Sequence, residues 1–154
     1  MQISKHLSLA EVVRSETAKR LGISNMPTPE HLENFKVLAD NVFEPIREHF
    51  KSPIHISSAY RSKELNQAIK GSLTSQHCEG KAIDIDMDCS ASGVSNADVF
   101  KYIKESLVFD QLIWEFGGNK NPDWVHVSYN EGKNRKQILK AEKIKGKTTY
   151  IPYK

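Results

Sequence analysis

The sequence predicts an α+β fold: a single domain in which N-terminal helices pack on a small, mostly antiparallel sheet. Two observations support this prediction. Apolar residues recur at helical spacing through the first 50 residues, whereas short alternating apolar segments follow from residue 54 onward. In addition, no repeat, low-complexity tract or linker divides the 154 residues, a length typical of one domain. We therefore expect one domain over residues 1–154.

Four helices are predicted, and capping residues, prolines or glycines mark their ends. Ser8 and Glu11 form a capping box at the start of the first helix, and Gly22 is suited to stop it in a left-handed conformation. Pro45 falls inside the longest apolar pattern, so we expect that helix to kink or divide there. The expected helices cover residues 8–20, 28–46, 61–70 and 95–107.

Four short strands are predicted, and two of them carry polar side chains on one face. Asp84 stands between Ile83 and Ile85, so it projects from the face opposite to these apolar neighbours. His126 has the same position between Val125 and Val127, so the two polar side chains converge if their strands pair. The expected strands cover residues 54–57, 82–87, 111–116 and 124–129.

His77, Asp84 and His126 together form a candidate metal site. His77 lies seven residues before Asp84, and Gly80 between them allows the turn that returns His77 to the same side. Two imidazoles and one carboxylate leave a fourth position of a tetrahedral zinc ion open, which is typical of catalytic rather than structural zinc. We therefore expect one Zn²⁺ per chain.

Hydrolysis at such a site also needs a base for the attacking water and an acid for the leaving amine. Asp123, three residues before His126, is the candidate for both. Strict alternation places it off the His126 face, but it follows Pro122 directly and need not obey the pleat. Arg61 is the candidate that stabilises an oxyanion or holds a substrate carboxylate.

The sequence allows two interpretations of the role of several other residues. Glu115 lines the cleft or is an exposed edge residue, and Asp86 supports the ligands or is only solvated. Trp124 is expected as core or cleft wall. Cys78 neighbours His77 but should point away from a metal in extended structure. A bridge from Cys78 to Cys89 is geometrically allowed, although free thiols are the simpler expectation.

Composition and charge exclude several classes of function. The net charge of +3 is a weak basic bias that suits an anionic polymer such as a cell wall, and residues 133–154 are expected to be a basic, solvated tail. No interleaved aromatics or nucleic-acid motif accompany this charge, so we expect no nucleic-acid partner. No signal peptide and no membrane insertion are expected, so the chain would be made in the cytoplasm.

Three blocks, SSAYRS at 57–62, SQHCEGKAID at 75–84 and DWVHVS at 123–128, resemble the signatures of the zinc D-alanyl-D-alanine carboxypeptidase family. That family includes bacterial carboxypeptidases, D-Ala-D-Ala dipeptidases and phage endolysins that cut peptidoglycan stem peptides. The resemblance spans about residues 53–129 and also includes the short phage-type helices before it. It implies a hedgehog/DD-peptidase-like fold.

The resemblance also implies roles for individual residues. The zinc ligands would be His77, Asp84 and His126, with Asp123 as general base and acid where some members carry glutamate. Arg61 would polarise the scissile carbonyl. Ser75 would support His77 or the substrate. We also expect substrate contacts from Tyr60, Trp124 and Glu115.

The resemblance implies a zinc peptidase that acts on peptidoglycan peptides. The expected lack of a signal peptide fits holin- or phage-mediated release to the wall and also fits a cytoplasmic dipeptidase; a monomer is expected. Which bond is cut stays open among D-Ala-D-Ala carboxypeptidase, cross-link endopeptidase and L-Ala-D-Glu endopeptidase activities. A non-hydrolytic, zinc-stabilised binding domain of the same fold, as in hedgehog signalling, is the alternative. The presence of Asp123 and Arg61 favours the enzyme.

Overall fold

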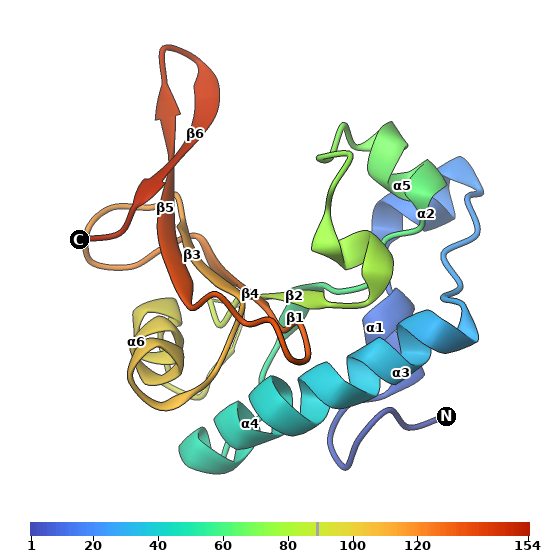
Figure 1. Ribbon diagram of the computed structural model, residues 1–154, viewed down its shortest axis with the longest axis horizontal. Helices are drawn as coiled ribbons and strands as arrows, with labels where there is room; N and C mark the ends of the chain where they lie inside the picture. Colours follow the sequence, from blue (N-terminus) through green and yellow to red (C-terminus); the bar gives the residue numbers. More distant parts are fainter. Residues whose placement is uncertain (89) are drawn as a thin grey trace.

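A computed structural model describes residues 1–88 and 90–154 of the chain (Figure 1). Six strands form one sheet in the order β1-β2-β4-β3-β5-β6, and every neighbouring pair is antiparallel except β3 and β5. The fold is therefore α+β with a mixed, mostly antiparallel sheet, as predicted. The strands are β1 (Ile56–Ser58), β2 (Ala82–Ile85), β3 (Gln111–Glu115), β4 (Trp124–Ser128), β5 (Gln137–Ile144) and β6 (Lys147–Pro152).

The longer helices, which contain Phe35, Phe43 and Ile103, cover one face of the sheet, and the other face carries the polar side chains (Figure 1). The strand residues Ile83, Leu112 and Val127 are fully buried against Phe35 and Ile103 of the helices. The described helices are α1 (Leu9–Val13), α2 (Glu16–Leu21), α3 (Pro29–Leu38), η1 (Ala39–Phe43), α4 (Glu44–Phe50), α5 (Lys63–Ala68), η2 (Gln76–Glu79) and α6 (Asn96–Ser106). Within the described ranges, no helix combines the length and the apolar character that crossing a membrane requires.

The first expected helix is two helices in the structure. The capping box of Ser8 and Glu11 is present and begins α1, and Gly22 ends α2 at φ 68° as expected. Between them Arg14 is extended, and the hydroxyl of Ser15 accepts a hydrogen bond from the amide of Ala18. Serine competes for backbone amides in this way and favours caps over helix interiors, so a second helix starts here.

The helix that contains Pro45 does not break but changes its winding. The π-helical segment η1 lies between α3 and α4, directly before Pro45. Proline has no amide hydrogen and its ring clashes with the carbonyl four residues earlier, and a wider turn at this point avoids both problems. The helix therefore continues to Phe50, beyond the expected end at residue 46.

The expectation of a solvated basic tail is wrong for residues 137–152. These residues form β5 and β6, a hairpin that extends the sheet beyond β3 and rises away from the helices (Figure 1). Residues 133–154 hold eight of the 22 lysines and arginines but one of the 19 acidic residues, so this segment has a net charge of +7 and the remainder −4. The many charged residues made the alternation of side chains in these two strands difficult to recognise from the sequence.

Candidate active site

The pairing of β2 with β4 brings Asp84 and His126 together. They are direct partners in the antiparallel register, and the Asp84 Oδ1 atom lies 3.0 Å from His126 Nδ1. Their neighbours Ile85 and Val125 are fully buried on the opposite face. The alternation expected from the sequence is therefore present and directs both side chains to the polar face.

His77 reaches this face from η2, the short 3-10 helix that precedes β2. Gly80 ends η2 at φ 74°, and a side chain there would overlap the carbonyl oxygen of His31. The Nδ1–H of His77 donates to the carbonyl of Ala59 at 2.6 Å. Because a carbonyl can only accept, this bond fixes the tautomer and leaves His77 Nε2 to face Asp84 at 3.2 Å.

The three side chains fit a zinc ion. Their donor atoms all lie within 4.8 Å of one another, and the two nitrogen–oxygen separations of 3.0 and 3.2 Å are close to the roughly 3.3 Å between neighbouring ligands of a tetrahedral zinc. Two neutral imidazoles and a carboxylate are also the donor set that zinc accepts. His77, Asp84 and His126 are therefore able to hold one zinc ion.

The protonation tendencies of the ligands agree with metal binding. Burial would raise the pKa of Asp84, but the two imidazoles, His77 first, hold it well below its usual range. Burial lowers the pKa of His77 and outweighs the opposite effect of Asp84. An ionised carboxylate beside a neutral imidazole is the state in which both residues bind a metal.

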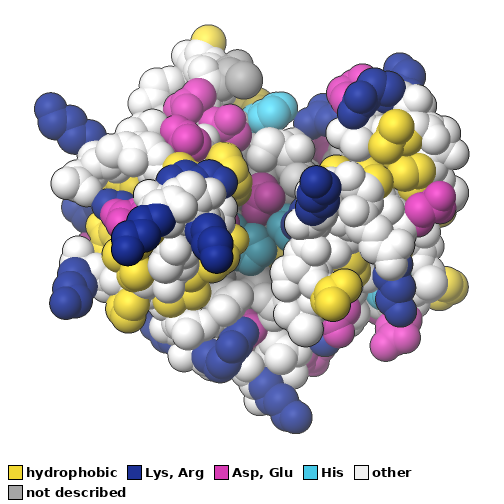
Figure 2. All heavy atoms as spheres, turned by 90° about the horizontal axis from the view of Figure 1, so that it is seen from above, with side chains coloured by type: hydrophobic (Ala, Val, Ile, Leu, Met, Phe, Trp, Pro, Cys, Tyr) yellow, Lys and Arg dark blue, Asp and Glu magenta, His cyan; other side chains and the backbone are white. Residues whose placement is uncertain are grey.

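The ligand group lies at the floor of a cleft of about 1040 Å³. In Figure 2, histidine and acidic side chains are visible at the bottom of a hollow between two lobes. The β5–β6 hairpin belongs to the left lobe and α5 to the right one. Arg61, Lys70 and Thr74 line one wall, and Leu139 and Tyr150 of the hairpin line the other.

Glu115 lies in this cleft, on the same face as the ligands. It pairs with Trp124 in the β3–β4 register, two positions from the pair of Ile113 with His126, so both pairs point to the same face. Its side chain is buried, with 5% of the residue exposed, so the edge-residue interpretation is excluded. Burial raises the pKa of Glu115 to about 7; Asp84 also raises it, while His126 and Arg61 oppose this. A carboxyl group with such a pKa can both accept and donate a proton near neutrality.

Asp123 occupies a different position from the one expected. It is exposed and does not line the cleft, and its amide donates to the carbonyl of Glu115 at 2.9 Å. Asp123 lies in a bend directly before β4, outside the strand that carries His126.

Arg61 and Ser75 stand beside the metal group. The Arg61 Nη2 atom lies 3.5 Å from the Ser75 hydroxyl, and its buried Nε has no hydrogen-bond partner among the described residues. The Ser75 hydroxyl also accepts from the amide of His77 at 3.3 Å, so it supports that ligand. A partly unpartnered guanidinium in a cleft is available to an anionic or carbonyl oxygen.

Of the remaining candidate residues, Trp124 forms part of the cleft wall, whereas Tyr60 lies in the protein core. Trp124 lines the cleft beside Phe116, with ring centroids 5.5 Å apart. Tyr60 does not: only 5% of it is exposed, and its ring contacts Phe35 in the core, so the expected substrate contact is wrong in this structure. Asp86 accepts from the side-chain amide of Asn96 at 3.1 Å and is structural.

The cysteines add little to the site. Burial raises the pKa of the Cys78 thiol, which disfavours the thiolate that a metal would bind. The described group of metal-ligand residues does not include Cys78. Cys89 lies outside the described residues, and so does any pairing with it.

Sequence reasoning missed a buried carboxylate that ties the two walls together. Asp110 is 1% exposed and accepts from the backbone amide, Nε and Nη2 of Arg135 and from the side chain of Gln76. These hydrogen bonds, Arg135 first, lower the pKa of Asp110 to about 2. Gln76 precedes a metal ligand and Arg135 precedes β5, so one carboxylate links the ligand segment to the hairpin. No local pattern in the sequence marks this contact.

Comparison with known proteins gives one match by overall similarity and one by family. Elongation factor Ts, mitochondrial, of Oryza sativa subsp. indica is 26% identical over 167 residues, which cover 94% of this chain and 41% of that protein. The chain thus spans about two fifths of that relative's length, and this low identity assigns no function here. The family model described as Peptidase M15 matches residues 5–128, about four fifths of the chain. The matched region contains β2, β4 and the ligand group, and the chain belongs to the peptidase M15 family of zinc peptidases, which resemble D-Ala-D-Ala carboxypeptidases.

Proposed function

We propose that this protein is a zinc-dependent peptidase that hydrolyses peptide bonds in peptidoglycan stem peptides. The observation that carries the proposal is the His77–Asp84–His126 group at the floor of an open cleft, with a buried carboxyl group and a guanidinium beside it. When bound, zinc supplies a Lewis acid that polarises a carbonyl and lowers the pKa of a water near it. The chain's own residues would supply proton transfer and charge stabilisation.

Glu115, rather than Asp123, is the residue we assign to proton transfer. The Glu115 carboxyl group shares the cleft with the ligands and has a pKa of about 7, whereas Asp123 is exposed outside the cleft. The ionised form of Glu115 would accept a proton from the attacking water, and the protonated form would deliver it to the leaving amine. A bound divalent cation lowers the pKa of Glu115 and increases the ionised fraction before attack.

Arg61 is the residue we assign to the oxygen of the scissile carbonyl. Its guanidinium lines the cleft that holds the ligand group and Glu115, which suits stabilisation of negative charge on that oxygen. Ser75 would act indirectly, because its hydroxyl contacts both Arg61 and the amide of His77. Trp124 would provide a wall against which the peptide rests.

Three variants and the purified protein test this assignment. The wild type should bind about one zinc per chain and cleave purified peptidoglycan, and chelation should abolish cleavage. Glu115→Gln should retain zinc and lose activity by about 10² to 10⁴-fold, the range for a general acid–base. Asp123→Asn is the matched control and should retain both zinc and activity. His126→Ala should lose the metal.

The opposite results have definite meanings. Full activity of Glu115→Gln with loss in Asp123→Asn would overturn the assignment and restore Asp123 as the base. Stoichiometric zinc without cleavage in the wild type would contradict the peptidase and favour the non-hydrolytic binding domain. Mass spectrometry of the digested muropeptides identifies the bond, whether of the D-Ala-D-Ala carboxypeptidase or the endopeptidase type. Action at the wall after holin- or phage-mediated release, as a monomer, belongs to the same proposal.

A further inference from the structure

The β5–β6 hairpin lies outside the part of the chain that matches the family model, which ends at residue 128. Even so, it forms one wall of the cleft. Its residues Gln137, Leu139, Thr148 and Tyr150 line the cleft opposite Arg61. The hairpin is therefore a part of this chain's cleft that the family match does not account for.

The register places one hairpin residue over the reaction centre. Tyr150 of β6 pairs with Ala141 of β5, which pairs with Glu115 of β3, and Glu115 pairs with Trp124 of β4. These four residues form one rung across the sheet. Adjacent strands are about 4.8 Å apart, so the Cα atoms of Tyr150 and Glu115 are separated by roughly 10 Å. A tyrosine side chain spans more than half of this distance.

The small residue between them leaves room for the tyrosine ring. Ala141 is fully buried although it lies on the cleft face, so neighbouring side chains close over it. Tyr150 itself is 53% exposed. Its partial burial raises its pKa, and Glu115 and Asp84 raise it further. The phenol lines the same cleft as Glu115 and Asp84 and keeps its proton at neutral pH.

The Tyr150 hydroxyl is free to bind a ligand. Among residues 1–88 and 90–154 it has no hydrogen-bond partner within the protein. A protonated phenol beside an open cleft can donate one hydrogen bond to a carbonyl oxygen. Leu139 pairs with Ile113 two register positions away on the same face and offers an apolar surface in the cleft. A bound peptide presents backbone carbonyls to a hydrogen-bond donor and apolar side chains to an apolar surface, so both contacts suit it.

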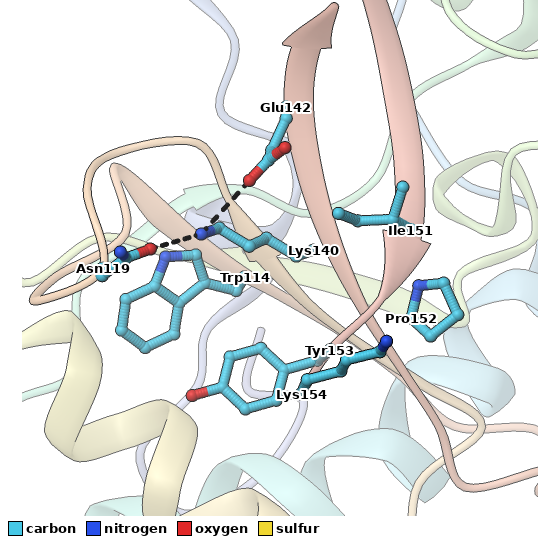
Figure 3. Close-up of a pocket in the computed structure, with 8 residues that line it drawn as sticks. All are labelled: Trp114, Asn119, Lys140, Glu142, Ile151, Pro152, Tyr153 and Lys154. Atoms are coloured by element: carbon cyan, nitrogen blue, oxygen red, sulfur yellow. Dashed lines mark hydrogen bonds and ion pairs between the residues drawn. The ribbon is translucent and has the colours of Figure 1, made fainter.

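The far face of the hairpin fixes this wall to the body of the protein (Figure 3). Tyr153 packs on Trp114 and Phe100, with ring centroids 5.8 and 4.8 Å away. Lys140 also reaches Asn119, in the connection between β3 and β4, at 2.7 Å, while its contact with Glu142 at 3.2 Å lies within β5. These contacts hold the wall in position before a substrate arrives, which reduces the entropy lost on binding.

We propose that the β5–β6 hairpin is a substrate-recognition wall and that the Tyr150 hydroxyl donates a hydrogen bond to a backbone carbonyl of the bound peptide. The inference rests on the proposed peptidase function and names a specificity-determining residue for it. The hydrogen bond forms with the bound substrate and persists through the reaction. Its loss therefore weakens binding and leaves the chemical step unchanged.

Tyr150→Phe removes this hydroxyl alone, and Tyr153→Phe removes a hydroxyl from the opposite face of the same strand end. With purified muropeptides as substrate, Tyr150→Phe should raise KM about tenfold at unchanged kcat, zinc content and Tm. Tyr153→Phe should match the wild type. A Tyr150→Phe KM within twofold of wild type, or an equal effect of Tyr153→Phe, would overturn the inference.

The same variants separate this inference from the proposed function. If the wild type cleaves muropeptides and Tyr150→Phe has an unchanged KM, the hairpin assignment fails and the peptidase stands. If the zinc-loaded wild type cleaves nothing, the peptidase fails, and calorimetric binding of the same muropeptides then decides the hairpin assignment. A Kd that is about tenfold weaker in Tyr150→Phe supports it, and an unchanged Kd refutes it.

Discussion

Replacing Glu115 by glutamine should stabilise the metal-free protein at alkaline pH while it removes activity. The Glu115 carboxyl group is 5% exposed, and burial raises its pKa from 4.5 to about 7. A carboxyl group with a raised folded-state pKa favours folding below the unfolded pKa, and this contribution is lost as pH rises through the folded pKa. Glutamine is neutral at every pH, so the variant does not lose this contribution to stability as pH rises.

The size of the effect follows from the shift. A rise of the pKa from 4.5 to about 7 corresponds to about 3 kcal/mol at high pH. About 2 to 3 kcal/mol of this total is lost between pH 5 and pH 8, because over most of that interval the carboxyl group is ionised in the unfolded chain and still protonated in the folded protein. The free energy of unfolding of Glu115→Gln relative to wild type should therefore rise by about that amount between the two pH values.

Urea denaturation in the presence of a chelator, at pH 5 and pH 8, measures the free energy of unfolding of wild type and of Glu115→Gln under the same conditions. The chelator matters because a bound cation would lower the pKa of Glu115 and reduce the effect. Asp123→Asn is the control: its exposed side chain should change the free energy of unfolding by no more than about 0.5 kcal/mol at either pH. An identical difference between Glu115→Gln and wild type at both pH values would refute the reasoning.

Two further predictions concern the supports of the site. Asp110→Asn should lower the free energy of unfolding by about 2 kcal/mol at neutral pH, since hydrogen bonds led by Arg135 lower the Asp110 pKa from 3.8 to about 2. This stabilisation is present above the unfolded pKa of the carboxyl group and is lost as pH falls through about 2. The free energies of unfolding of Asp110→Asn and wild type should therefore approach each other below pH 4. A constant difference between them would contradict the prediction. Gly80→Ala should cost about 2 kcal/mol or more and weaken zinc binding, because its Cβ would overlap the His31 carbonyl at a positive φ. Gly132→Ala, also at positive φ but with open space around it, is the control and should cost only about 1 kcal/mol with zinc affinity unchanged.

Much of the site could be predicted from short stretches of the sequence. Alternation alone assigned Asp84 and His126 to one face, because each lies between apolar residues whose burial fixes the other face. The left-handed Gly80 explains how His77 returns to that face. In each case the physical determinant is local: a pleat of period two, or a turn that only glycine adopts without strain.

The residues that the sequence misplaced depend on contacts between distant segments. Alternation cannot tell whether a strand is at an edge or covered, so Glu115 kept two interpretations until β5 was found beside β3. The burial of Tyr60 against Phe35 likewise depends on a helix packed across the chain. The β5–β6 hairpin was expected to be a solvated tail because its many charged residues made the alternation of side chains typical of strands difficult to recognise.

The sequence by itself therefore determined which face of its strand each of Asp84 and His126 occupies and the helices and strands up to residue 129 in outline, since burial of apolar residues at fixed periods is encoded locally. The tertiary structure alone decided which carboxylate lies in the cleft and what closes its second wall. Strand order, and the desolvation that raises the pKa of Glu115, arise only when segments up to a hundred residues apart pack together.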